Sequence, residues 1–182
     1  MKILETKLGG VYSIEADNFH DERGSFIKTF HKDTFLQNNF NTVFEESFYS
    51  ISKKNVIRGM HFQIPPAHHS KLVYVANGAI IDVILDIRKE SPTYGQHISV
   101  ELSAKNHMMI YIPVGFAHGF MSLIDDSCTV YLQSTMRSAE HESGILFDSF
   151  GMDWNTKETI VSKRDLTFKS LKDFETPFIY KK

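Results

Sequence analysis

Short apolar segments separated by turn residues make up most of the chain, and the pattern is clearest from residue 71 onward. Residues 71–76 and 79–88 flank Asn77-Gly78, a dipeptide that suits the tight type I′ turn between two paired strands. We therefore predict a β-hairpin here. Four further strands are expected at regular spacing, over residues 97–102, 107–112, 119–124 and 128–135.

The second arm of the predicted hairpin alternates in its side chains. Two interleaved sets run along it: Ile81, Val83 and Leu85, and Asp82, Ile84 and Asp86. Because successive side chains of a strand point to opposite faces, this alternation predicts that one face is apolar.

The first 70 residues predict similar elements with one exception. Strands are expected over residues 11–16, 25–30, 42–52 and 55–62, with a turn at 21–24. The exception is residues 32–39, which favour one or two helical turns with Asp33 or Thr34 as N-cap. Pro65-Pro66 ends the strand before it, and the more polar tail after Trp154 predicts irregular structure with some helix.

About ten short strands without long helices between them indicate an all-β sandwich or barrel and not a parallel sheet. The 182 residues fit one domain, 1–182, long enough to bury a sizeable core. The 15 phenylalanines support this fold class, since aromatic side chains favour pleated, half-buried surfaces.

Composition and charge exclude several classes of partner. The net charge of −2, with no basic run, makes nucleic acid and anionic membranes poor candidates. The single cysteine, Cys128, excludes an internal disulfide and a cysteine-rich metal site, and its strand setting predicts an inert thiol. No targeting signal and no apolar run of membrane-spanning length appear, so we expect a cytoplasmic protein.

Candidate chemistry lies where polar residues interrupt apolar strands. The first polar stretch is residues 57–71. In it, Arg58 could hold an anion, His61 could move a proton and Lys71 could stabilise a developing negative charge. Arg58 and His61 are three residues apart and would face opposite ways in a regular strand, but Gly59 permits a bulge that could redirect one of them. A second polar stretch, residues 113–120, contains His118, and we predict that strand pairing joins the two stretches in one active site.

Each of these residues also has a structural interpretation. A histidine or tyrosine in an apolar strand often only packs, and His68-His69 is interpreted as a polar loop. A metal site is an alternative, because His61, His118 and one of His68 or His69 could supply three imidazoles. The barrel-type metal motif, two histidines one residue apart followed by a carboxylate, is absent, and we therefore expect no metal.

Taken together, six motifs resemble those of the dTDP-4-dehydrorhamnose 3,5-epimerase family over about residues 10–166. They are Asp21-Glu-Arg-Gly-Ser-Phe26, Val56-Ile-Arg-Gly-Met-His-Phe-Gln63, Lys71-Leu-Val73, Asp86-Ile-Arg-Lys-Glu-Ser-Pro-Thr-Tyr-Gly95, Leu102-Ser-Ala-Lys-Asn106 and Pro113-Val-Gly-Phe-Ala-His-Gly-Phe120. The resemblance implies a double-stranded β-helix, a cupin-like jelly roll with short peripheral helices. It also implies a homodimer whose subunits exchange strands, with neither a metal nor an organic cofactor.

The family's reaction is epimerisation next to the C4 ketone of a nucleotide-diphosphate 4-keto-6-deoxyhexose. By resemblance, His61 is the base and Asp165 is the carboxylate paired with it. Tyr131 matches the acid on the opposite face, and Lys71 matches the cation near the C4 oxygen.

The resemblance places substrate binding on a second set of residues. These are Arg23, Phe26, Lys28, Glu46, Arg58, His118, Glu142 and Arg164. Arg23 and Arg58 match positions that bind the diphosphate, and Arg164 stands where the family commonly has lysine.

Several recognition positions depart from the family pattern. Lys28 replaces a common Glu, Glu46-Ser-Phe48 replaces Gln-x-Asn, and Met136-Arg137 replaces a Tyr-Tyr pair. These positions belong to the nucleotide end of the pocket. They leave open whether the base is thymine or cytosine, since Glu46 could accept from an exocyclic amine.

Five alternatives to a dTDP-sugar 3,5-epimerase remain open at this point. The chain could invert C3 only or prefer a CDP-sugar. It could be a sugar 3,4-ketoisomerase or a metal-dependent barrel enzyme. From another class, it could be a barrel that binds a nucleotide sugar without catalysis.

Overall fold

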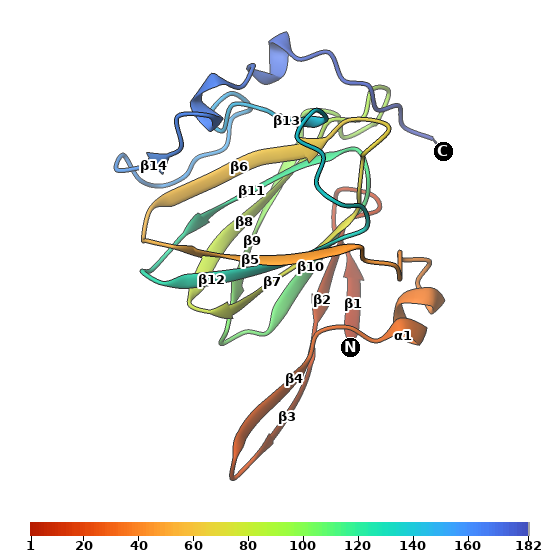
Figure 1. Cartoon of the computed structure of the whole chain (residues 1–182), viewed down its shortest axis with the longest axis vertical. Coiled ribbons are helices and arrows are strands. Elements are labelled where there is room, and N and C mark those ends of the chain that lie inside the picture. Colours follow the sequence, from red (N-terminus) through yellow and green to blue (C-terminus); the bar gives the residue numbers. More distant parts are fainter. Residues whose placement is uncertain (182) are drawn as a thin grey trace.

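The computed structural model describes residues 1–181, and two facing antiparallel sheets dominate it (Figure 1). In spatial order, the first sheet consists of β1 (Lys2–Glu5), β2 (Tyr12–Glu15), β10 (Met108–Ile112), β7 (Lys71–Asn77), β12 (Ser127–Gln133) and β5 (Glu46–Ser52). The second consists of β13 (Glu142–Gly144), β6 (Val56–Gln63), β11 (Phe116–Ser122), β8 (Ala79–Asp86) and β9 (His97–Ser103), with β14 (Ile160–Val161) parallel to β6. This is a jelly roll, and it confirms the predicted all-β fold class.

The remaining elements lie outside the two sheets. The hairpin of β3 (Asp17–Asp21) and β4 (Gly24–Lys28) projects away from the sandwich (Figure 1). Helix α1 (Lys32–Gln37) confirms the predicted short helix. The tail after Trp154 holds the 3-10 turns η1 (Asp165–Thr167) and η2 (Leu171–Asp173), as expected for irregular structure with some helix. Within residues 1–181, no helix has the length and apolarity needed to cross a bilayer.

The predicted hairpin around Asn77-Gly78 is wrong. The turn exists, with Gly78 at φ +81°, but it carries the chain from one sheet to the other. Strand β7 pairs with β10 and β12, whereas β8 pairs with β11 and β9. The turn residues set a local reversal of the chain but cannot specify which strands become partners. In this jelly roll, consecutive strands from β5 to β12 alternate between sheets, and only β8 and β9 pair directly.

Apolar side chains fill three layers. Between the sheets, the core combines residues such as Val73 and Ile110 of the first sheet with Ile84 and Phe120 of the second. The outer face of the second sheet packs under the C-terminal segment, and the outer face of the first packs against α1 and the chain around it. Burial on both sides fixes the strand register, because a slip of one residue would exchange the two faces.

In strand β8, apolar and charged residues alternate, yet both faces of the strand are buried. The predicted apolar face, with Val83 and Leu85, packs under the C-terminal segment. The other face is buried too, since Asp82 and Asp86 have no exposed surface. These carboxylates therefore point into the protein, where buried charges need partners.

Candidate active site

A bulge in β6 brings the two predicted polar stretches together. His61 is opposite His118 on β11, whereas Arg58 is opposite Phe120, so three steps on β6 match two on β11. Gly59 occupies the bulge at φ +148°, and a Cβ there would lie 2.5 Å from the Cα of Gly119. Both the predicted bulge and the predicted pairing of the two stretches are confirmed.

The paired stretches border a cavity of about 940 Å³ between the two sheets. Its walls come from β5, β7 and β12 on one side, from β6 and β11 on the other, and from the chain at 137–143 and 160–168. Eight of the twelve predicted site residues line it: Arg58, His61, Lys71, His118, Tyr131, Glu142, Arg164 and Asp165.

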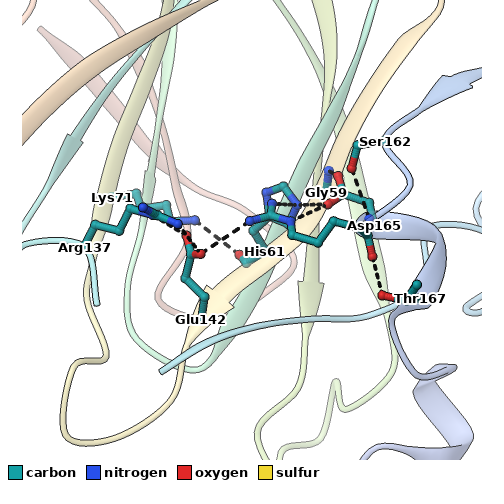
Figure 2. A network of polar contacts seen from close by, with 9 residues as sticks. Gly59, His61, Lys71, Arg137, Glu142, Ser162, Asp165 and Thr167 are labelled. Atoms are coloured by element: carbon teal, nitrogen blue, oxygen red, sulfur yellow. Dashed lines mark hydrogen bonds and ion pairs between the residues drawn. The ribbon is translucent and has the colours of Figure 1, made fainter. Parts of the chain in front are cut away.

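The side chains of His61 and Asp165 meet at one wall of the cavity. His61 Nε2 lies 3.0 Å from Asp165 Oδ1, and Asp165 Oδ2 accepts from Gly59 N–H at 3.5 Å (Figure 2). Burial alone would raise the pKa of Asp165, but its contacts with His61 and Arg164 lower that pKa to about 2. Asp165 is therefore a fixed carboxylate beside the imidazole. Burial makes the largest contribution to the lowered pKa of His61.

Lys71 enters from β7 and is almost fully buried. Its Nζ donates to the backbone oxygen of His61 at 3.2 Å (Figure 2). Burial lowers the pKa of Lys71 to about 8, although the charges of Asp82 and Glu142 act in the opposite direction. The cation is thus held beside the histidine with little competition from water.

Tyr131 belongs to β12, in the sheet opposite His61. Its ring stacks on Phe48 with a centroid separation of 4.8 Å, and its hydroxyl lies 3.4 Å from Ser50 Oγ. Burial raises the pKa of Tyr131, so the phenol stays protonated over the physiological range. The cavity therefore has a basic group on one wall and a phenolic proton donor on the other.

His118 contacts a buried carboxylate that the sequence pattern did not single out. Its Nε2 lies 2.7 Å from Asp82 Oδ1, and both side chains are buried. Burial raises the pKa of Asp82, and within residues 1–181 its Oδ2 has no hydrogen-bond partner. His118 and Tyr131 also meet edge to face, with ring centroids 6.2 Å apart.

Arginines and one glutamate form the mouth of the cavity. Glu142 pairs with Arg137 through two contacts of 2.8 and 2.9 Å (Figure 2). It also pairs with Arg164 Nη1 at 3.4 Å. Arg164 also donates from Nε to Asp165 Oδ1 and from Nη2 to His61 Nε2, each at 3.1 Å. Arg58 donates to Ser52 Oγ at 3.0 Å and to the Ile51 carbonyl at 3.3 Å.

Four predicted site residues lie outside the cavity of the same chain. Arg23, Phe26 and Lys28 belong to the projecting β3–β4 hairpin and its turn, where Arg23 pairs with Asp21 and is 86% exposed. Glu46, at the start of β5, accepts from the backbone N–H of Arg137 with its Oε2 at 2.6 Å. That carboxylate is thus engaged in holding the loop that carries Arg137.

Sequence reasoning missed several residues of the site. Asp82 was assigned only to an alternating strand, and Ser50 lies in a strand without a distinguishing motif. The His68-His69 segment is a loop, as predicted, but His69 lines the cavity, and its Nδ1 lies 3.1 Å from Gln63 Nε2. Only the proximity of His68-His69 to Lys71 in the sequence could have suggested that His69 lines the cavity.

Within residues 1–181, no group of three or more His, Cys, Asp or Glu side chains is arranged to hold a metal ion. The arrangement instead supports proton transfer. The carboxylate-paired His61 can accept a proton, Tyr131 can donate one from the opposite wall, and Lys71 can stabilise negative charge between these steps.

A jelly roll whose cavity carries these groups on opposing walls defines a cupin-like protein with a cavity suited to proton transfer. Comparison with known proteins gives the family. The family model described as dTDP-4-dehydrorhamnose 3,5-epimerase matches residues 5–173, and the chain belongs to this family.

Individual relatives extend the comparison to sequence and structure. The chain is 37% identical over 177 residues to a dTDP-4-dehydrorhamnose 3,5-epimerase of Methanothermobacter thermautotrophicus, covering 94% of this chain and 95% of that protein. The crystal structure of the Legionella pneumophila dTDP-6-deoxy-D-glucose-3,5-epimerase with dTDP-4-keto-L-rhamnose superposes with a TM-score of 0.94 at 31% identity, covering 100% and 99%. A 3′-monoepimerase of Streptomyces bikiniensis in complex with dTDP-quinovose gives 0.87 at 28% identity, covering 92% and 86%.

Proposed function

We propose that this protein is a cofactor-independent epimerase that inverts C3 and C5 of a dTDP-4-keto-6-deoxyhexose. The observation that carries the proposal is the placement of His61 and Tyr131 on opposing walls of one cavity. Epimerisation requires a proton to leave from one face of the sugar and to return to the other, so a base and an acid on the same side would not suffice.

The ketone at C4 supplies the driving force for proton abstraction. It acidifies the neighbouring C–H bonds, His61 takes the proton, and the electron pair moves onto the C4 oxygen as an enolate. The buried ammonium of Lys71 stabilises that oxyanion, and its low-solvent surroundings strengthen the interaction. Tyr131 then returns a proton to the opposite face of the carbon, and solvent restores the protonation of both residues.

Thymidine diphosphate is the nucleotide that the comparisons favour. The relatives reported above act on, or were crystallised with, dTDP-linked sugars according to their names. Glu46 remains the candidate for reading the base, and a CDP-linked sugar is the alternative it suggests. Such an enzyme would belong to cytoplasmic deoxysugar synthesis for cell-surface polysaccharides.

Inversion at C3 alone is the second candidate function. The structural similarity to a 3′-monoepimerase, at 92% coverage of this chain, favours it. A monoepimerase and a 3,5-epimerase can share the same base and acid, so only the product distinguishes them.

Solvent exchange tests the proposal directly. The protein is incubated in D₂O with dTDP-4-keto-6-deoxyglucose, and the sugar is followed by NMR. Deuterium at both C3 and C5 with inversion is expected, whereas deuterium at C3 alone identifies the monoepimerase. A CDP-linked substrate run in parallel tests the base, and movement of the keto group would identify a ketoisomerase. Absence of exchange with either substrate contradicts an epimerase and leaves a binding barrel.

We also propose that the protein works as a homodimer with exchanged strands. Strand β5 is the edge of its sheet, and its Phe48, Tyr49 and Ile51 are exposed apolar side chains. The projecting hairpin adds Phe19 and Phe26, which are 55% and 64% exposed. Such surfaces usually mark an interface. In this arrangement the hairpin carries Arg23, Phe26 and Lys28 to the cavity of the partner subunit.

Mixed dimers test this arrangement. His61→Asn removes the base of its own cavity, and Arg23→Ala removes the hairpin's contribution to the other cavity. If hairpins are exchanged, one cavity of each mixed dimer is intact, and co-refolding the two inactive variants restores about a quarter of the activity. No restoration, or a monomeric mass by light scattering, contradicts the exchanged dimer.

A further inference from the structure

Two residues compete for the same ring nitrogen of His61. Arg164 Nη2 hydrogen-bonds to His61 Nε2 at 3.1 Å, and Asp165 Oδ1 lies 3.0 Å from that nitrogen. A guanidinium has only donors, so in this contact Nε2 must be the acceptor. A carboxylate has only acceptors, so in its contact Nε2 must carry the proton. The two contacts require opposite tautomers of the neutral imidazole.

The tautomer determines whether His61 can act as a base. When Nε2 accepts from Arg164, the ring proton is on Nδ1 and the lone pair of Nε2 is occupied, so neither nitrogen can take a substrate proton. When Nε2–H donates to Asp165, the lone pair is on Nδ1 and is free. The arrangement in which Arg164 bonds to His61 is therefore a blocked form of the base.

Arg164 and Asp165 differ in their freedom to move. The Asp165 side chain is 3% exposed, and its backbone N–H donates to Ser162 Oγ at 3.1 Å. The Arg164 side chain is 53% exposed, so solvent or a ligand can reach its guanidinium, although its Nε donates to the buried Asp165 at 3.1 Å. Its contact with Glu142, at 3.4 Å, is longer than those of Arg137 with the same carboxylate. Of the two competitors, Arg164 is the one that can leave.

We propose that Arg164 is a positioning residue that blocks the ring nitrogen of His61 in the free protein and releases it when the phosphate oxygens of the nucleotide sugar bind the guanidinium. Arginine suits this exchange because its planar fork binds phosphate through two parallel hydrogen bonds. Once it has moved, Asp165 fixes the tautomer in which His61 can accept a proton. This inference rests on the proposed function, since it takes the ligand to be a nucleotide diphosphate sugar.

Other charged groups around His61 do not produce the same effect. Those facing it from the surrounding elements are Lys71 on β7, Glu142 on β13, His118 on β11, Asp165 on η1 and Arg164 before η1. Lys71 donates to the backbone oxygen of His61 and not to the ring. Among the described residues, only Arg164 offers a hydrogen-bond donor to the ring nitrogens.

Nitrogen NMR of the histidine side chains tests the proposal without turnover. The tautomer of His61 is read from ¹⁵N-histidine protein, assigned by comparison with His61→Asn, before and after saturation with inorganic diphosphate or dTDP. The variants are Arg164→Gln and, as a matched control, Arg137→Gln, which removes a guanidinium that contacts Glu142 but not His61. Melting temperatures confirm that each variant is folded.

We expect the free wild type and Arg137→Gln to carry the His61 proton on Nδ1, and diphosphate to move it to Nε2. Arg164→Gln should show the Nε2–H form with or without diphosphate. The same tautomer in free wild type and free Arg164→Gln overturns the proposal, as does a wild-type tautomer that diphosphate leaves unchanged. If the tautomer switches but no nucleotide sugar exchanges its protons, the proposed epimerase function fails while this inference stands for the diphosphate.

The pH profile gives a second readout that a merely structural role would not move. The positive charge of Arg164 contributes, after burial, to the lowered pKa of His61 in the free protein. A base works above its pKa, so removing Arg164 should move the acidic limb of kcat/KM to higher pH. The limb of kcat reports the substrate complex, where Arg164 has already left, and should keep its position. Parallel movement of both limbs contradicts the release step.

Discussion

The deep end of the cavity and its mouth are built differently. Asp165, Lys71 and His118 in the deep end are buried, and each has a polar partner in the protein interior. At the mouth, the Arg137 and Arg164 side chains are more than half exposed and share the single carboxylate of Glu142. Burial makes the largest contribution to the shifted pKa values of His61, Lys71 and Tyr131, whereas exposed and exchangeable ion pairs line the mouth.

Most departures from the family pattern fall on one side of this division, and Phe48, which stacks on Tyr131, is the exception. Arg137 and Arg164 lie at the mouth, and Lys28 lies on the exposed hairpin. Glu46 holds the loop of Arg137. The residues that the resemblance assigns to the chemistry are His61, Lys71, Tyr131 and Asp165, and they match the family motifs. We therefore expect that residues at the mouth can change without disturbing the buried groups proposed to transfer protons, and the following variants test this separation.

Of the four substitutions Asp165→Asn, Tyr131→Phe, Lys71→Arg and Arg137→Gln, the first should reduce activity most. The amide keeps the shape and can still accept from Gly59 N–H, but it removes the negative charge beside His61 and favours the wrong tautomer. We expect kcat to fall by about 10³-fold to 10⁴-fold, as found where a carboxylate orients a catalytic histidine. Steady-state turnover of the dTDP-sugar measures it. A loss of kcat below tenfold would show that proton abstraction does not depend on the His61–Asp165 pair.

Tyr131→Phe should reduce inversion by about 10²-fold, the range typical of a lost general acid. The ring and its stacking on Phe48 remain, so the fold should be retained. Because His61 still removes the proton and can return it to the same face, deuterium exchange should fall less than inversion. NMR measures both rates on one sample. An equal loss of exchange and inversion would contradict the division of roles between the two walls.

Lys71→Arg should change the pH dependence of the epimerase activity. Lys71 must be charged to stabilise the enolate, and its pKa of about 8 means that this charge is lost as the pH rises through that value. Activity of the wild type should therefore fall above about pH 8. Arginine stays protonated, so the variant should lack this alkaline limb even if its overall rate is lower. If the variant keeps the fall in activity above about pH 8, that fall reports the titration of a group other than Lys71. Tyr131 is a poor candidate for that group, because its pKa is raised.

Arg137→Gln should have the smallest effect. It breaks an exposed ion pair with Glu142, which is weak by its position, and leaves every buried contact of the deep end in place. We expect KM for the dTDP-sugar to rise by less than about tenfold, with kcat the less affected constant. Initial rates over a range of substrate concentrations measure both. A loss of kcat comparable to that of Tyr131→Phe would remove the distinction between mouth and deep end.

Sequence reasoning found what depends on local pattern. The apolar periodicity placed most strands, and the glycine at position 59 marked the bulge that brings Arg58 and His61 into one cavity. The partners of β7 and β8 could not be predicted, because the alternation of strands between sheets is a property of the whole fold. Asp82 was hidden for the same reason, since a carboxylate in an alternating strand is normally assigned to a solvated face.

Residues distant in the sequence needed the family resemblance. Nothing local distinguishes Tyr131 from a packing residue, and Asp165 lies in an irregular tail that reaches His61 only in the folded chain. The sequence shows Arg137 only as part of the replacement of a Tyr-Tyr pair, and its paired contacts with Glu142 are visible only in the structure.

In the proposed reaction, His61 removes a proton from the carbon next to the ketone. This role is tested by deuterium incorporation from D₂O into dTDP-4-keto-6-deoxyglucose, measured for wild type, His61→Asn and the control His97→Asn. His97 lies on β9 and does not line the cavity. We predict exchange by the wild type and the control, and none above background for a folded His61→Asn. Exchange retained by His61→Asn would contradict the account.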